Sequence, residues 1–167
     1  AQKMPGKKAM IVISNGKSTR ANGSLARTEE QLRMAGVETV IFDKVGVNPL
    51  KSTVEEGGRF AKAQGCDFVV ALGGGSVMDA AKIMWVMYEH PEANFEDMAM
   101  DFMDIRKRVY TFPEMGQKAY FVAIPTSSGT GSEVTPFAII TDADTGVKWP
   151  LADYQLLPNM AIVDVDN

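Results

Sequence analysis

Short, mainly apolar runs alternate along the chain with longer amphipathic or polar stretches. These runs lie at Ala9–Ile13, Val37–Phe42, Phe68–Leu72, Tyr120–Ile124 and Met160–Val163. Apart from Glu38 and Thr39 in the second run, their apolar residues are contiguous and do not alternate with polar ones, which is typical of strands buried on both faces of a parallel sheet. We therefore predict a strand at each run.

The stretches between the first three runs have helical character. The first helix is expected from Ser24, as its N-cap, to about Met34, with Leu25, Leu32 and the Met34–Ala35 pair on its inner side. Gly36 is expected to end it.

A second helix is expected to open with Pro49, a favourable first residue, and to run to about Gln64 before Gly65. A third is predicted from about Val77 to Tyr88, and a fourth around Phe95 to Val109. The basic triplet at 106–108 is interpreted as a solvated face of that fourth helix.

The C-terminal part contains a predicted β-hairpin, because Phe137–Thr141 and Lys148–Leu151 flank a polar turn that ends in Gly146. The whole pattern predicts one α/β domain over residues 1–167. Its expected fold is Rossmann-like and doubly wound: a mainly parallel sheet with helices on both faces, plus the hairpin near the C-terminus.

Composition excludes several classes of protein. Hydrophobic residues make up 46% and charged residues 23%, which is ordinary for a soluble globular protein. The net charge of −4 disfavours nucleic acid or an acidic membrane surface as the main partner. Cys66 is the single cysteine, so we expect a small packed residue and a cytoplasmic location. His90 is the single histidine, and a lone histidine is no metal site.

The most informative stretch follows the third apolar run. Gly73, Gly74, Gly75 and Ser76 come directly after the strand and directly before a helix. Glycines let the backbone approach an anion closely, and the free N–H groups of a helix N-terminus suit a phosphate. The spacing matches neither G-x-G-x-x-G nor a P-loop. Lys82, further along the helix, is interpreted as a solvated lysine.

A second polar loop follows the fourth apolar run, at Thr126–Gly131, and its hydroxyl and N–H groups could hold sugar, phosphate or amide. In open parallel sheets, ligands bind beyond the carboxyl ends of the strands. The loops at Ser14–Arg20, Asn48–Pro49, Gly73–Ser76 and Thr126–Gly131 are all expected at that edge. Their convergence predicts a nucleotide-binding site.

Four features together resemble the nucleotide-binding half of the iron-containing (group III) alcohol dehydrogenases. They are Gly-Gly-Gly-Ser-Val-Met-Asp-Ala-Ala-Lys, Pro-Thr-Ser-Ser-Gly-Thr-Gly-Ser-Glu, the Lys148 hairpin and Ala161-Ile-Val-Asp164. The resemblance covers nearly the whole chain. From about Met84 to Asp153 the chain is similar to the alcohol dehydrogenase part of bifunctional aldehyde–alcohol dehydrogenases, and about the first 60 residues are more similar to the stand-alone, butanol-dehydrogenase type.

The resemblance implies a set of cofactor contacts. Gly74, Gly75 and Ser76 would hold the pyrophosphate, with Asp79 near it. Asn48 would touch the nucleotide, and Lys148 would reach the ribose beside the nicotinamide. The residues that would line the adenine and ribose part of the site are Thr126, Ser127, Ser128, Gly129 and Thr130. No catalytic residue is expected in this chain, because the family's metal, Fe2+ or Zn2+, is held by a following helical domain.

The loop after the first strand bears on the choice of cofactor. NAD-preferring relatives often carry an acidic residue at the end of that strand, where Ser14 stands here. Hydroxyl groups together with Lys17 and Arg20 suit a 2′-phosphate, so the expected cofactor is NADP in preference to NAD.

The function expected from the resemblance is hydride transfer between NAD(P)(H) and a primary alcohol or aldehyde, in a homo-oligomeric full-length parent with no nucleic-acid or membrane partner. The 167-residue chain alone is expected to be inactive. Two alternatives remain open at this point. One is a zinc enzyme like glycerol dehydrogenase or dehydroquinate synthase, and the other is a non-catalytic nucleotide-binding or assembly module.

Overall fold

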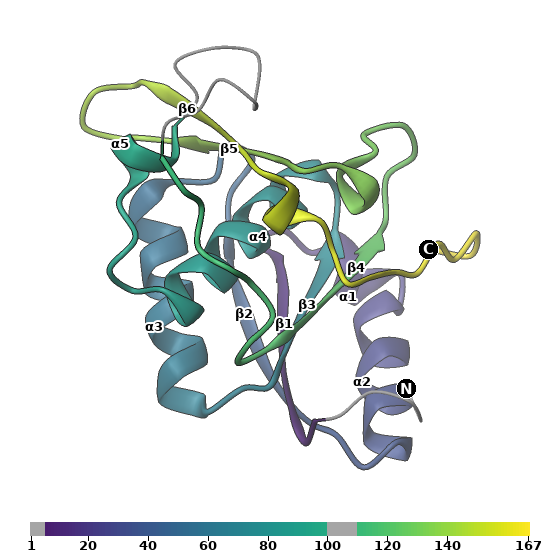
Figure 1. Ribbon diagram of the computed structural model, residues 1–167. Coiled ribbons are helices and arrows are strands. Elements are labelled where there is room, and N and C mark those ends of the chain that lie inside the picture. Colours follow the sequence, from purple (N-terminus) through teal and green to yellow (C-terminus); the bar gives the residue numbers. More distant parts are fainter. Residues whose placement is uncertain (1–5, 100–109) are drawn as a thin grey trace.

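The computed structural model describes residues 6–99 and 110–167, and its centre is a five-stranded sheet (Figure 1). The strands are β1 (Lys8–Ser14), β2 (Glu38–Val45), β3 (Phe68–Gly73), β4 (Tyr120–Pro125) and β7 (Met160–Ala161). Their order is β2-β1-β3-β4-β7, and every neighbouring pair is parallel. The predicted parallel sheet is therefore confirmed.

Helices cover both faces of this sheet. The helices are α1 (Ser18–Ala21), α2 (Ser24–Met34), α3 (Lys51–Gln64), α4 (Gly75–Glu89) and α5 (Phe95–Met98). Figure 1 shows α2 and α3 on opposite sides of the strands. Because successive side chains of a strand point to opposite faces, the sheet separates two cores.

The two cores follow the strand alternation. Met10, Val12 and Phe121 point toward α3 and α4 and belong to the larger core, which continues under the hairpin. Ile11 and Val70, one residue out of phase, belong to the smaller core beneath α2. In α4 nearly every residue is buried, so this helix is the hydrophobic centre of the larger layer.

The hairpin consists of β5 (Phe137–Thr141) and β6 (Lys148–Ala152), which pair antiparallel. Gly146 adopts a φ of +70°, the left-handed conformation that its turn requires. Short 3-10 turns precede and follow the hairpin at Ser132–Val134 and Tyr154–Leu156. The predicted hairpin is confirmed, and Figure 1 shows it lying across one end of the helical layer.

Helix starts differ from the prediction. Gly23, with a φ of +81°, is the N-cap of α2, and the Asn22 side chain accepts a hydrogen bond from the Ser24 amide, so Ser24 is not the cap. The helix after β2 begins at Lys51 and not at Pro49, because Leu50 is still extended. The helix after the glycines begins at Gly75, two residues before the predicted Val77.

Three further predictions differ from the structure or concern residues that the structure does not describe. Met34 is 70% exposed, so it does not face the core, whereas Leu32 and Ala35 pack against it. The last strand is only Met160–Ala161, shorter than predicted. The expected helix Phe95–Val109 is present as α5 to Met98, and its remainder, including the basic triplet at 106–108, lies mostly outside the described residues. No helix in the described parts of the chain has the length and apolar character to cross a membrane.

Candidate functional site

The glycine turn, Gly73–Ser76, lies where β3 ends and α4 begins. Gly74 is extended, with φ −81° and ψ −173°, and its carbonyl accepts the first helical hydrogen bonds, from the Val77 and Met78 amides. The N-terminus of a 15-residue helix therefore opens at this turn. Free N–H groups and the helix dipole at such an end favour an anion.

The Thr-Ser loop, Thr126–Gly131, packs directly against the glycine turn. The Thr126 amide donates to the Gly73 carbonyl at 3.0 Å, which extends the pairing of β3 and β4 by one step. A Cβ on Gly74 would lie 3.0 Å from the Ser127 hydroxyl oxygen, and one on Gly75 would lie 3.4 Å from Thr130. The absence of side chains in the turn is thus what allows the second loop to approach so closely.

Two hydrogen bonds connect the segments that carry Asn48 and Lys148 to the start of α4 and to each other. The Ser76 hydroxyl donates to the Val47 carbonyl at 2.6 Å, which ties the start of α4 to the loop carrying Asn48. The Thr141 amide donates to the Pro49 carbonyl at 2.8 Å, and Thr141 is the cross-strand partner of Lys148. The structure therefore assembles four distant segments around the helix N-terminus.

The loop after β1 lies at the same edge but differs from the expected electrostatics. Ser14 is half-buried and Lys17 is exposed. Arg20, in α1, forms an ion pair with Asp43 on β2 at 2.7 Å, and both side chains are about half exposed. Arg20, which is expected from the sequence to be available for a 2′-phosphate, is thus paired with a carboxylate of a neighbouring strand.

Lys82 is fully buried, so the prediction of a solvated lysine is wrong. Its amine donates to the Thr135 carbonyl at 2.6 Å and to the Phe137 carbonyl at 2.9 Å. Asp79, one turn earlier, accepts a hydrogen bond from the Ile139 amide at 3.1 Å. The Asp79 side chain thus faces β5, although the sequence predicts it beside the pyrophosphate.

Burial shifts the pKa values of both groups toward their neutral forms. Desolvation lowers the pKa of Lys82 to about 8, against the opposing effect of Asp79 and Glu133. Desolvation also raises the pKa of Asp79, although the Ile139 amide, Lys82 and the Ser132 hydroxyl oppose this. A fully buried lysine and a partly buried aspartate therefore interact where α4 contacts the start of β5.

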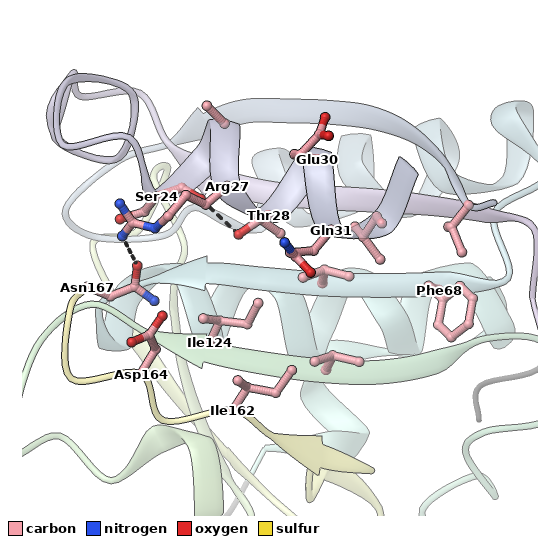
Figure 2. A pocket seen from close by; sticks show the side chains of 15 residues that line it. Ser24, Arg27, Thr28, Glu30, Gln31, Phe68, Ile124, Ile162, Asp164 and Asn167 are labelled. Atoms are coloured by element: carbon pink, nitrogen blue, oxygen red, sulfur yellow. Dashed lines mark hydrogen bonds between the residues drawn. The ribbon is translucent and has the colours of Figure 1, made fainter. Parts of the chain in front are cut away.

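A groove of about 710 Å³ lies on the other face of the sheet, under α2 (Figure 2). Its walls include Thr28 and Gln31 of α2, Ile124 of β4 and Ile162, which directly follows β7, with Asp164 at one end. None of the predicted cofactor residues lines it. The groove and the four-segment arrangement at the helix N-terminus are therefore separate features.

The described residues do not fit a metal centre. Among residues 6–99 and 110–167, no three His, Cys, Asp or Glu side chains are grouped so that they could share an ion. His90 lies at the end of α4, where its ring contacts the Glu114 carbonyl at 2.8 Å and the Glu92 carboxylate at 3.2 Å. We therefore derive no chemical step through a metal held by these residues.

A parallel sheet with helices on both faces, a glycine turn that opens a helix and a polar loop beside it define a Rossmann-like α/β fold. The family profile described as iron-containing alcohol dehydrogenase matches residues 1–165. The chain belongs to this family, and the resemblance predicted from its motifs is confirmed.

Similar sequences come from two kinds of enzyme. The chain is 58% identical to a bifunctional aldehyde-alcohol dehydrogenase of Escherichia coli K12 over 145 residues, which are 87% of this chain and 16% of that protein. It is 42% identical to an NADPH-dependent butanol dehydrogenase of Clostridium saccharobutylicum over 161 residues, 96% of this chain and 39% of that protein. The chain thus spans well under half of the length of these relatives.

Solved structures show the same fold. An archaeal alcohol dehydrogenase from a Red Sea brine pool superposes with a TM-score of 0.84 at 36% identity, over 96% of this chain and 40% of that one. An NADH-dependent butanol dehydrogenase of Thermotoga maritima superposes with a TM-score of 0.80 at 28% identity, over 95% and 37%. The predicted fold class is confirmed by both.

For three residues in this region, the buried position or the partner was not identified from the sequence. Lys82 lies on a helix that is apolar on nearly all sides, which was a readable signal that a charge there would be buried. Asp43 of β2 pairs with Arg20 of α1, and no local pattern reveals such a contact. Thr19 is buried in α1, and its hydroxyl has no hydrogen-bond partner within the described residues.

Proposed function

We propose that this chain is the dinucleotide-binding part of an alcohol dehydrogenase that transfers hydride between NAD(P)(H) and a primary alcohol or aldehyde. The observation that carries the proposal is the packing of the Thr-Ser loop on the glycine turn, at the N-terminus of α4. Family membership supports the reaction class. The proposal extends to a cytoplasmic, homo-oligomeric full-length protein.

The contribution of these residues is binding and orientation of the cofactor. Gly74, Gly75 and Ser76 would receive the pyrophosphate at the helix N-terminus, where backbone N–H groups and the dipole stabilise negative charge. The exposed residues Ser127–Thr130 would contact the adenosine. Asn48 and Lys148, held nearby through Pro49 and Thr141, would contact the remainder of the nucleotide.

The preferred cofactor in this proposal is NADPH. Ser14 and the exposed Lys17 can bind a 2′-phosphate, whereas Arg20 must first be released from Asp43. Relatives give support in both directions, because the Clostridium saccharobutylicum enzyme is described as NADPH-dependent and the Thermotoga maritima enzyme as NADH-dependent. We therefore expect a modest preference, with NADPH binding more tightly than NADH.

The test is isothermal titration calorimetry of the 167-residue chain with NADPH and with NADH, in parallel with a Gly75→Ala variant. The added methyl group would sit 3.4 Å from Ser132 and Thr130, a contact the fold tolerates with small shifts. It would occupy the space that a phosphate needs, so affinity should fall by about tenfold or more while the melting temperature changes little. Unchanged affinity in this variant, or no binding by the wild-type chain, would contradict the proposal. The isolated chain should show no turnover with butyraldehyde and NADPH.

A further inference from the structure

Lys82 is a buried lysine of α4 that binds the segment between the Thr-Ser loop and β5. Its side chain is fully enclosed, and its amine is held by two backbone carbonyls, those of Thr135 and Phe137. Removing an ammonium group from water is unfavourable unless hydrogen bonds compensate. A solvated lysine at this position would avoid that cost. The hydrogen bonds of the buried Lys82 must therefore stabilise the structure enough to offset it.

Lys82 and Asp79 both form hydrogen bonds with the backbone of one continuous segment. Lys82 donates to the carbonyls of Thr135 and Phe137, and Asp79 accepts from the amide of Ile139. Residues 135, 137 and 139 are every second residue of the extended segment that enters β5. Their backbone N–H and C=O groups therefore point to the same side, toward one face of α4. Two side chains from a single helical turn therefore hold the whole start of the hairpin.

The Thr-Ser loop is consequently anchored at both ends to the same structural unit. At its first end, the Thr126 amide binds the Gly73 carbonyl of β3. Beyond its second end, Thr135 is held by Lys82 from α4. The glycine turn joins β3 to α4, so the two anchors lie on either side of the turn that the loop packs against.

We propose that Lys82 is a positioning residue, which fixes the Thr-Ser loop against the glycine turn at the separation that dinucleotide binding requires. This inference rests on the proposed function of the same site. Lys82 itself does not touch the cofactor, because its amine is enclosed by α4 and β5. Loss of its two N–H donors would free the loop at the Thr135 end while Thr126 stays paired.

The experiment compares Lys82→Met with Lys118→Met in the 167-residue chain. Lys118 is the control for loss of a lysine that donates to a backbone carbonyl: it is exposed, and its amine donates to the Glu89 carbonyl at 2.6 Å, at the opposite end of α4. Each variant is measured for melting temperature, for NADPH and NADH affinity, and for hydrogen exchange of the segment 126–139. Lys82→Gln, which keeps one donor group, is the second variant at this position.

The expected result is a loss of affinity of about tenfold or more in Lys82→Met, a smaller loss in Lys82→Gln, and a change within about twofold in Lys118→Met. Segment 126–139 should exchange faster in Lys82→Met alone. Equal affinities in Lys82→Met and Lys118→Met would overturn the inference. Failure of both Lys82 variants to fold would also overturn it, because Lys82 would then serve the fold as a whole.

Hydrogen exchange separates this inference from the proposed function. If the wild-type chain binds neither dinucleotide, the proposed function fails, and exchange then decides the role of Lys82. Faster exchange of segment 126–139 in Lys82→Met than in Lys118→Met would still support loop positioning. Equal exchange in the two variants would overturn it.

Discussion

Replacing Glu89 with alanine should destabilise the fold strongly, because one buried carboxylate holds the segment that leads into β4. Glu89 is 3% exposed at the end of α4. Its Oε1 accepts from the Trp85 indole at 3.0 Å and from the amides of Lys118 at 3.1 Å and Ala119 at 2.9 Å. Its Oε2 accepts from the Gln117 amide at 3.0 Å.

The size of the effect follows from what each donor would lose. The Trp85 indole also donates to the Ala119 carbonyl at 3.0 Å, so it keeps a partner. The Ala119 amide is buried and would be left unsatisfied, which costs about 1–3 kcal/mol. Gln117 and Lys118 are exposed residues, so water can partly replace the lost acceptor, at about 0.5–1 kcal/mol each. We expect Glu89→Ala to lower the free energy of unfolding by about 2–5 kcal/mol.

Glu89→Gln provides the internal comparison. Glutamine can keep one oxygen at the Oε1 position and loses chiefly the contact with Gln117, so we expect a cost of about 1 kcal/mol. The assay is equilibrium urea unfolding followed by tryptophan fluorescence. Glu92→Ala is the control, because the Glu92 side chain is 74% exposed and its pair with His90 should contribute little. A Glu89→Ala cost below about 1 kcal/mol, or equal costs for alanine and glutamine, would refute the reasoning.

Three further outcomes are expected. Burial raises the pKa of the Cys66 thiol to about 11, so Ellman's reagent at pH 8 should react only as the chain unfolds; fast reaction without urea would contradict this. Asp43→Asn should release Arg20 and tighten NADPH binding more than NADH binding by calorimetry; equal changes would count against the role of Arg20. The pKa of Lys82 is lowered to about 8, so between that pH and its ordinary value near 10.5 the native chain binds fewer protons than the unfolded chain. Over this range the unfolding free energy of the wild type should rise relative to Lys82→Met, by up to about 3 kcal/mol, and urea titrations at pH 7.5 and 10 would reveal a flat difference if this is wrong.

The fold could be predicted well because its central strands, β1, β3 and β4, are buried on both faces. Continuous apolar runs such as Phe68–Leu72 are visible in the sequence, and β3 extends this one by a single residue. Helix ends were harder, since capping depends on conformations that composition does not reveal. Gly23 adopts a left-handed φ and lets Asn22, not Ser24, satisfy a helix amide.

The candidate site was predictable only where it is local. The glycine turn and the Thr-Ser loop each follow a strand, so topology alone placed them at one edge. The contacts that hold them are non-local: Lys82 reaches β5, and Arg20 reaches β2. A single lysine in a helix gives no sign of a partner more than fifty residues away, except that the other residues around it are apolar.

The sheet order has a consequence for how the chain is made. β1 is bordered by β2 and β3, so residues 8–73 contain three adjacent strands, with β1 paired to each of the other two, and the covering helices α2 and α3. This unit can assemble on the ribosome before Thr126 has been synthesised. At typical elongation rates, the partner loop would follow the glycine turn by roughly 3–10 s. The glycine turn of the nascent chain would therefore stay uncovered for several seconds, until the Thr-Ser loop has been synthesised.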